Sequence, residues 1–271
     1  MIIDSHTHIS FPAYDKDRDE VFARAKEKGV KMICVGTQIE TSKLSIDLAK
    51  KYPESIWATV GYHPNHLADD WYHDKKEQIN KSPEKFDIVK LKELARDEKV
   101  VAIGECGLDY FRMEKDNKRK QKQVFLEQAK LAKELDKALM IHARPSKESD
   151  DAYEDILEAL DGDFNDIAKI CHFYVGSVAM TKKLVEAGFY FTFGGVITFA
   201  RDYDEQIKMI PLEKILLETD APYVAPALYR GKRNEPGFII ETAKKMAKIK
   251  QKKYDKIAEI TSENAKRVFK I

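Results

Sequence analysis

Eight short apolar runs recur along the chain with longer stretches between them, and this alternation constrains the fold more than any other feature. The runs cover residues 1–4, 31–37, 56–63, 100–107, 138–143, 167–173, 190–195 and 214–220. Their continuous apolar character is typical of parallel strands that are covered on both faces. Helical spacing marks residues 17–29, 87–97, 117–136, 177–188 and 257–269. The pattern predicts an α/β fold, a (β/α)8 TIM barrel.

The length and composition fit one barrel. The chain has 271 residues, and no linker or compositional break interrupts it, so residues 1–271 are expected to form a single domain. Apolar residues make up 43% and charged residues 34%, which fits a globular protein. A net charge of +1 excludes a broad positive field, so a nucleic acid would need a local basic patch. The helix at 257–269 is expected to pack outside the barrel.

The cysteines and the apolar runs bear on location. Cys34, Cys106 and Cys171 lie in apolar runs and are odd in number, which favours packing roles and a reducing compartment. No signal-peptide segment follows Met1, and no run approaches the roughly 18 apolar residues of a membrane helix. The sequence predicts a cytoplasmic protein with no membrane partner and indicates no obligate protein partner.

Titratable side chains interrupt the apolar runs, always toward the same end. They are His6, His8, His63, Glu105, His142, His172 and Asp220. In a barrel the carboxyl ends of all strands share one face, where active sites lie. His6 and His8 are two residues apart on a strand, so both can point toward the barrel axis and bind one ion. The spacing predicts a metal site built from residues far apart in sequence.

The types of these residues limit which metal ions can bind and which of the residues can take part in proton transfer. Imidazoles and carboxylates suit one or two divalent ions such as Zn, Mn, Co or Ni, whereas Mg prefers oxygen ligands. Two ions need a bridging carboxylate, for which Glu105 is the candidate, and Asp220 can bind metal and accept the proton of an attacking water. A lone histidine in an apolar run is more often a core residue than a ligand. The prediction of a metal site therefore depends on the fact that all these residues lie at the same end of their strands.

Several short motifs follow one another along the chain. They are DSHTH (4–8), GYHP (61–64), GECGLDY (104–110), IHAR (141–144), CHFY (171–174), ETDAPY (218–223), RGKRNEP (230–236) and TSENAKRVF (261–269). Their order over nearly the whole chain resembles the TatD-related metal-dependent deoxyribonucleases, a branch of the amidohydrolase-like barrels. The resemblance implies hydrolysis of DNA phosphodiester bonds, in the family often by a 3′-to-5′ exonuclease.

The resemblance also assigns roles to individual residues. It implies His6 and His8 as ligands of one ion, His142 and His172 as ligands of a second, Glu105 as the bridge, and Asp220 as ligand and base. His63 would contact the substrate phosphate, and Asp109 would steady a ligand. The family's nuclease activity is usually described with Mg, which four imidazoles do not favour, so the identity of the metal stays open.

Other segments bear on the substrate. Arg230 and Arg233 follow the last strand and can meet a phosphate backbone, whereas the acidic residues 150–166 oppose a long duplex. A strand end or a short single-stranded segment is therefore the expected DNA partner. Residues 64–86 are polar and irregular and are expected to form an elaborated loop over the active face. His66 and His73 within it are expected to be solvated.

Two other functions stay open from the sequence. The first is a metal-dependent hydrolase of the same barrel class that acts on a non-nucleic-acid ester, lactone or amide, or on aminoacyl-tRNA, because the pocket alone decides the substrate. The second is a binding or scaffold protein that holds a structural metal. Asp220 and the open coordination positions argue against the second.

Overall fold

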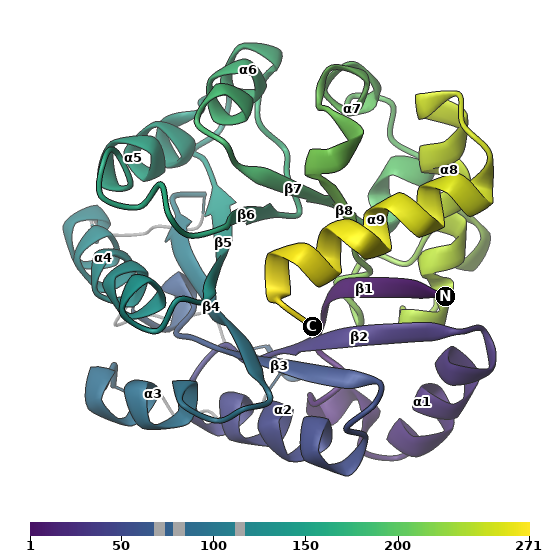
Figure 1. Cartoon of the computed structure of the whole chain (residues 1–271), viewed down its shortest axis with the longest axis horizontal. Helices are drawn as coiled ribbons and strands as arrows, with labels where there is room; N and C mark the ends of the chain where they lie inside the picture. The colour runs from purple at the N-terminus through teal and green to yellow at the C-terminus, as the bar shows by residue number, and fades with distance from the viewer. Residues whose placement is uncertain (68–73, 78–84, 112–116) are drawn as a thin grey trace.

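Eight parallel strands form one sheet in which each strand pairs with the next along the chain (Figure 1). The computed structural model describes residues 1–67, 74–77, 85–111 and 117–271. The strands are β1 Ile2–Thr7, β2 Val30–Val35, β3 Ile56–Val60, β4 Val100–Asp109, β5 Ala138–Arg144, β6 Lys169–His172, β7 Tyr190–Phe193 and β8 Ile215–Leu217. The predicted parallel α/β barrel is confirmed.

Helices follow the strands and surround the barrel (Figure 1). They are α1 Arg18–Glu27, α2 Ile39–Lys51, α3 Ile88–Ala95, α4 Lys118–Glu134, α5 Asp151–Ala159, α6 Val178–Glu186, α7 Asp204–Met209, α8 Ile239–Lys250 and α9 Tyr254–Phe269. Short 3-10 turns are η1 Pro12–Tyr14, η2 Pro64–Leu67, η3 Gly195–Thr198, η4 Leu212–Lys214, η5 Ala227–Tyr229 and η6 Pro236–Phe238. The acidic segment at 150–166 contains α5, a helix that the sequence reading did not single out.

Backbone hydrogen bonds bring the first strand and the segment after the last strand together. The Asp220 amide donates to the His6 carbonyl at 2.9 Å, and the His8 amide donates to the Ala221 carbonyl at 2.8 Å. The barrel is therefore nearly closed, and the DSHTH motif lies directly against ETDAPY. This closure places residues from both halves of the chain side by side.

Helix α9 has a different position from the ring of helices. It lies across one end of the barrel in Figure 1, where its Val268 and Phe269 pack with inward side chains such as Ile3, Met140 and Leu216. The expectation that this segment packs outside the barrel was wrong. Its apolar face instead forms a floor under the amino-terminal halves of the strands, which leaves the carboxyl ends as the open face.

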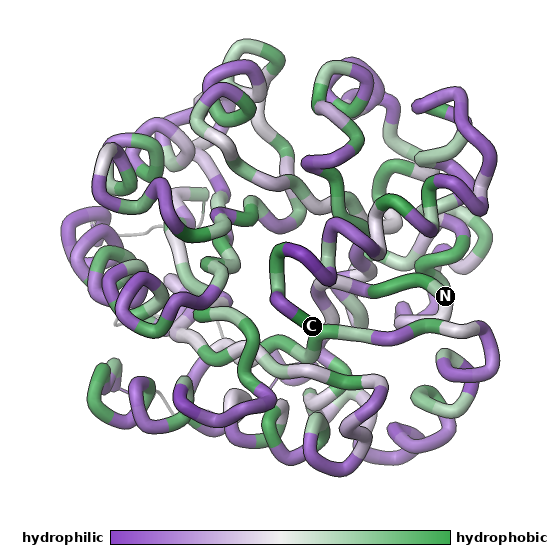
Figure 2. The backbone as a smooth tube through the Cα atoms, in the orientation of Figure 1, coloured by the Kyte–Doolittle hydropathy of each residue, from purple (hydrophilic) through white to green (hydrophobic). Residues whose placement is uncertain are grey.

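Most of the remaining core lies between the strands and the surrounding helices. Figure 2 shows hydrophobic strands, and helices whose turns alternate between hydrophobic and hydrophilic residues, as expected when one helix face is buried. Buried side chains such as Phe125 of α4 and Leu184 of α6 belong to this layer, and each contributes about 1.5–3 kcal/mol. The three cysteines are free and buried, as the packing interpretation requires. Among the described residues, no helix is long and apolar enough to span a bilayer.

Candidate metal centre

A pocket of about 750 Å³ opens at the carboxyl ends of the strands. Its lining includes His8, His63, Glu105, His142, His172 and Asp220. His6 is fully buried directly beneath, with its Nε2 3.1 Å from His8 Nε2. The structure thus brings all the predicted ligands and His63 together on one face of the barrel.

Two of the ligands lie where strand pairing is irregular. The β1–β2 register shifts between Asp4 and Thr7, which brackets His6. The β4–β5 register shifts between Ile103 and Cys106, which brackets Glu105. Irregular pairing of this kind changes the direction of a side chain, and it is common next to active sites. The backbone itself therefore helps to turn these side chains into the pocket.

One carboxylate oxygen of Glu105 faces imidazoles from three other strands. Its Oε1 lies 2.9 Å from His172 Nε2, 3.0 Å from His142 Nδ1 and 3.2 Å from His63 Nε2. His172 ends β6, His142 lies two residues before the end of β5, and His63 follows β3. Oε1 of Glu105 thus faces a group of donors that come from β5, β6 and the end of β3.

The other oxygen of Glu105 faces the histidine pair of β1. Its Oε2 lies 3.4 Å from His6 Nε2 and 3.6 Å from His8 Nε2. Asp220 Oδ1 joins this group, 3.4 Å from His8 Nε2 and 3.8 Å from His6 Nε2. Glu105 therefore stands between two groups of nitrogen and oxygen donors, which is the position of a bridging carboxylate.

Hydrogen bonds orient the far nitrogens of several imidazoles. His8 Nδ1 donates to the Val35 carbonyl at 3.0 Å, which leaves Nε2 for the pocket. His142 Nε2 donates to Asp109 Oδ2 at 3.1 Å, which leaves Nδ1 for the pocket. Metal-binding histidines usually donate their other N–H to a carbonyl or carboxylate in this way. The contact agrees with the supporting role that the motif suggested for Asp109.

His63 has the opposite hydrogen-bonding pattern. The Asn65 amide donates to His63 Nδ1 at 3.1 Å. Burial and the neighbouring His142 lower the pKa of His63, so the ring is neutral and its single proton is on Nε2. This Nε2–H points toward Glu105 Oε1 and the pocket. Although His63 lies close enough to Glu105 and His142 to join a metal group, its proton suits a substrate oxygen better than an ion.

Burial and neighbouring charged groups shift the pKa values of the residues in the cluster. Burial alone would raise the pKa of Glu105, but His172 and His63 beside it hold the pKa well below its ordinary value. Burial lowers the pKa of His172, but Glu105 and Glu218 outweigh burial and raise it well above its ordinary value. Burial and the neighbouring His172 lower the pKa of His6 to about 3, so His6 is neutral, which is the form that binds metal.

The donor atoms fit a divalent ion. Zn–N bonds of about 2.0–2.1 Å place neighbouring donors of one tetrahedral ion about 3.3 Å apart. The separations are 3.1 Å between His6 and His8 Nε2, 3.4 Å from His6 Nε2 to Glu105 Oε2, and 3.4 Å from His8 Nε2 to Asp220 Oδ1. Imidazole and carboxylate donors suit Zn, Mn, Co and Ni. The residues therefore fit the cation that the sequence predicted.

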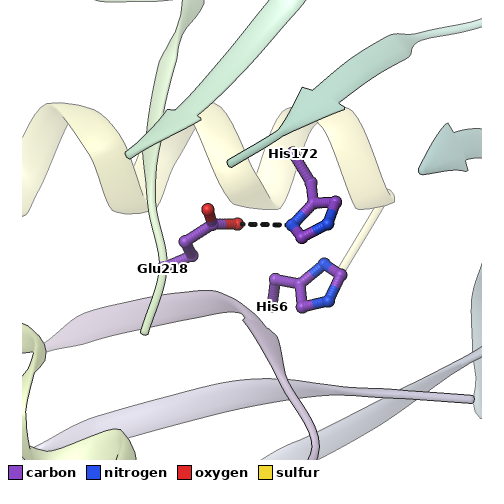
Figure 3. Close-up of side chains that lie close together, drawn as sticks. All are labelled: His6, His172 and Glu218. Atoms are coloured by element: carbon purple, nitrogen blue, oxygen red, sulfur yellow. Dashed lines mark hydrogen bonds and ion pairs between the residues drawn. The ribbon is translucent and has the colours of Figure 1, made fainter. Parts of the chain in front are cut away.

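Glu218 is a residue of the centre that the sequence reading missed. It is fully buried and accepts hydrogen bonds from the Phe173 amide at 2.8 Å and from Thr192 Oγ1 at 2.5 Å. Its Oε2 lies 3.4 Å from His172 Nδ1, and the His172 ring stacks on His6 at 3.8 Å (Figure 3). The available signal was a carboxylate that ends an apolar run, two residues before Asp220.

Glu218→Gln is expected to weaken metal binding about 10–100-fold, because a neutral amide accepts a weaker hydrogen bond from the His172 N–H than a carboxylate does. The measurement is the dissociation constant for Zn²⁺ in competition with a chelating dye. Glu205→Gln, at an exposed position on α7, is the control and should bind metal as the wild type does. Unchanged affinity in a folded Glu218→Gln protein would show that Glu218 serves packing only.

The polar segment after β3 reaches back to the pocket. Residues 74–77 are described, and Asp74, Lys76 and Glu77 line the pocket. Glu77 Oε1 lies 2.7 Å from His66 Nε2, and the His66 ring is buried while Glu77 is half-buried. The expectation of a solvated His66 was wrong, because this carboxylate partner lets the ring be buried. The loop covers one side of the site as expected, while His73 lies outside the described residues.

Arg230 and Arg233 are not brought into the pocket lining. Both Arg233 Nη atoms donate to Asp17, at 2.8 and 2.6 Å, and the guanidinium lies 4.4 Å from the Tyr14 ring centre. The Arg230 guanidinium stacks on Phe199 at 4.2 Å. Phosphate contact by these two residues stays a prediction, and the guanidinium that does line the pocket is that of Arg144.

Known proteins resemble this chain over its full length. The family model described as TatD related DNase matches residues 3–270. The chain is 38% identical to a Bacillus subtilis (strain 168) protein named Uncharacterized metal-dependent hydrolase YabD, over all of both chains. It is 33% identical to the 3'-5' ssDNA/RNA exonuclease TatD of Salmonella typhimurium, over 100% of this chain and 99% of the relative. The solved structure of the Escherichia coli k12 TatD homolog YJJV aligns with a TM-score of 0.83 and 28% identity, covering 100% and 98% of the two chains.

Proposed function

We propose that this chain, which belongs to the TatD related DNase family and is a metal-dependent hydrolase, removes nucleotides from an end of single-stranded DNA. The observation that carries the proposal is Glu105, whose two oxygens face two separate groups of imidazoles beneath a pocket of about 750 Å³. A relative with 33% identity has the name of a 3'-5' ssDNA/RNA exonuclease, which supports the choice of substrate.

The pocket would hold two divalent cations. One would bind to His6, His8, Asp220 and Glu105 Oε2, and the other to His142, His172 and Glu105 Oε1. When bound, such cations supply Lewis-acid chemistry, which makes water more acidic and neutralises charge on phosphate oxygens. Glu105 fixes the spacing between the two groups because it contacts both.

Asp220 and His63 would carry the proton chemistry. Asp220 lines the pocket, its side chain is 15% exposed, and its Oδ1 lies at the edge of the His8 group, so it can accept a proton from the attacking water. His63 presents its Nε2–H to the same space, where it can donate to a phosphate oxygen. Arg144 adds a positive charge to the lining.

The charge of the pocket walls favours a strand end. Asp74, Glu77 and Lys76 line the side formed by the loop after β3, which gives that side a net negative charge, whereas Arg144, the last residue of β5, is positive. Carboxylates repel the phosphates of a continuing backbone, so a strand that continues over this loop is disfavoured. A terminal nucleotide fits this asymmetry better than the middle of a strand does.

Metal removal and replacement test the proposal. Protein stripped with a chelator should not digest end-labelled single-stranded DNA, and adding Mn²⁺, Zn²⁺ or Mg²⁺ should restore release of mononucleotides from one end. The same preparations are given RNA and small esters. Ester turnover without any nuclease activity would contradict the proposal and favour a hydrolase of another substrate class.

A further inference from the structure

We infer that the single strand whose end occupies the metal pocket leaves it over Phe199 and Arg230 and continues along a basic groove on the outside of α8. This inference deepens the proposed nuclease function and rests on it. The groove, called the α8 groove below, encloses about 900 Å³ between α8 and the turns η3 and η5. Its lining includes Thr198, Leu228, Lys244, Lys245, Lys248 and Lys252.

The α8 groove carries more positive than negative charge. Its lining contains four lysines and one carboxylate, that of Glu241. Lys244 pairs with Glu241 at 2.7 Å, and Lys245 lies 3.7 Å from Asp204. The two remaining lysines, considered next, have no carboxylate partner among the described residues.

Lys248 and Lys252 are the lysines that can serve a ligand. Both are exposed, and no ion pair within 4.0 Å is formed by either one in the described part of the chain. A groove with unneutralised ammonium groups along one side of a helix complements a chain of phosphates. An uncharged partner would gain no such electrostatic attraction from the groove.

Two exposed apolar side chains lie in or next to the α8 groove, because Leu228 lines it and Phe199 follows Thr198 of its lining. Phe199 is 42% exposed and carries the exposed Arg230 guanidinium on its ring at 4.2 Å. Leu228, in the groove lining, is 68% exposed. An exposed ring stacked with arginine, next to a basic groove, is the combination that single-strand binding proteins use for bases and backbone. The bases of a single strand can stack on this ring, whereas an acidic peptide has no bases to do so.

The metal pocket and the α8 groove share one loop. Val224 lines the metal pocket and Leu228 lines the α8 groove. Four residues span at most about 14 Å, so the two sites are close neighbours. The Ala227 amide donates to Thr198 Oγ1 at 2.7 Å and fixes η5 against η3. A strand that leaves the pocket along this loop therefore reaches the α8 groove at Leu228.

Binding without cleavage tests this path. In excess chelator, fluorescence anisotropy reports binding of labelled oligothymidylate of about 20 nucleotides, which is longer than typical single-strand sites. The double variant K248E/K252E should bind about tenfold more weakly, and its slope of log affinity against log salt should fall by about 1.4, or 0.7 for each lost phosphate contact. The control K130E/K182E carries the same charge change at exposed positions on α4 and α6.

Two further readouts separate the possible occupants. Phe199→Ala should weaken binding of oligothymidylate about tenfold through lost base stacking, and should leave binding of an abasic oligomer unchanged. If polyglutamate binds the wild type as tightly as DNA does, the groove serves an acidic protein and the inference is wrong. Hydrolysis of a thymidine dinucleotide, which is too short to reach the lysines, should be equal in K248E/K252E and the wild type.

Failure of the inference and failure of the proposed function are distinguishable. If the wild type digests single-stranded DNA but K248E/K252E binds it as tightly as K130E/K182E does, the path is wrong and the nuclease function stands. If no oligonucleotide is hydrolysed with any metal, the nuclease function is wrong. Anisotropy then still decides whether the α8 groove binds a single strand.

Discussion

Glu105→Ala is expected to lower kcat/KM on single-stranded DNA by about 10³-fold or more, because it removes the carboxylate that contacts both donor groups. The variant should also lose at least one of the two proposed ions, measured by atomic emission after gel filtration. Glu105→Gln keeps the shape of the side chain and should lose nearly as much activity, since an amide cannot neutralise two cations. Both effects follow from the charge rather than the size of the residue.

Cys106→Ala is the matched control for Glu105→Ala. Cys106 is the next residue on β4, is fully buried, and belongs to the core rather than the pocket lining. Its replacement should cost about 1 kcal/mol of stability and leave metal content intact. A Glu105→Ala protein that is folded by circular dichroism and retains full metal content and activity would refute the proposed centre.

Asp220→Asn is expected to reduce kcat by about 10²–10⁴-fold, the range for loss of a general base. The metal content should fall less than in Glu105→Ala, because His6, His8 and Glu105 remain in the same group. The measurement is kcat at saturating metal, so that weaker metal binding does not imitate lost proton transfer.

The choice of asparagine follows from the backbone at this position. Asp220 has a φ of 53°, in the left-handed region that asparagine tolerates and alanine does not. Asp220→Ala would therefore mix backbone strain with lost chemistry. Wild-type kcat in Asp220→Asn would show that another group accepts the proton.

The sequence predicts the strand ends and their ligands because that information is local. An apolar run that stops at His142 or His172 marks the buried strand and its exit in the same few residues. Equivalent ends then meet, since all strands of a parallel barrel point the same way. The order of motifs adds the assignment of each histidine to one of two groups, which the distances around Glu105 support.

The sequence does not show which residues contact one another across the barrel. His66 looked solvated because it lies in a polar segment, and only its contact with Glu77 explains its burial. Glu218 was missed because its role depends on a bond to His172 in another strand. The floor formed by α9 likewise depends on packing against several strands at once. Such features need the distances between segments.

The closure of the barrel determines how much of the chain must be synthesised before the metal centre can form. His6 leaves the ribosome first among the donor residues and Asp220 last, yet they belong to one group and their backbones share a hydrogen bond. The floor under the strands comes later still, with Phe269 of α9. A nascent chain that has passed His172 therefore has most of its donors but neither the last strand nor the floor. Since domains fold as units, the metal centre is complete only after Phe269 has left the ribosome.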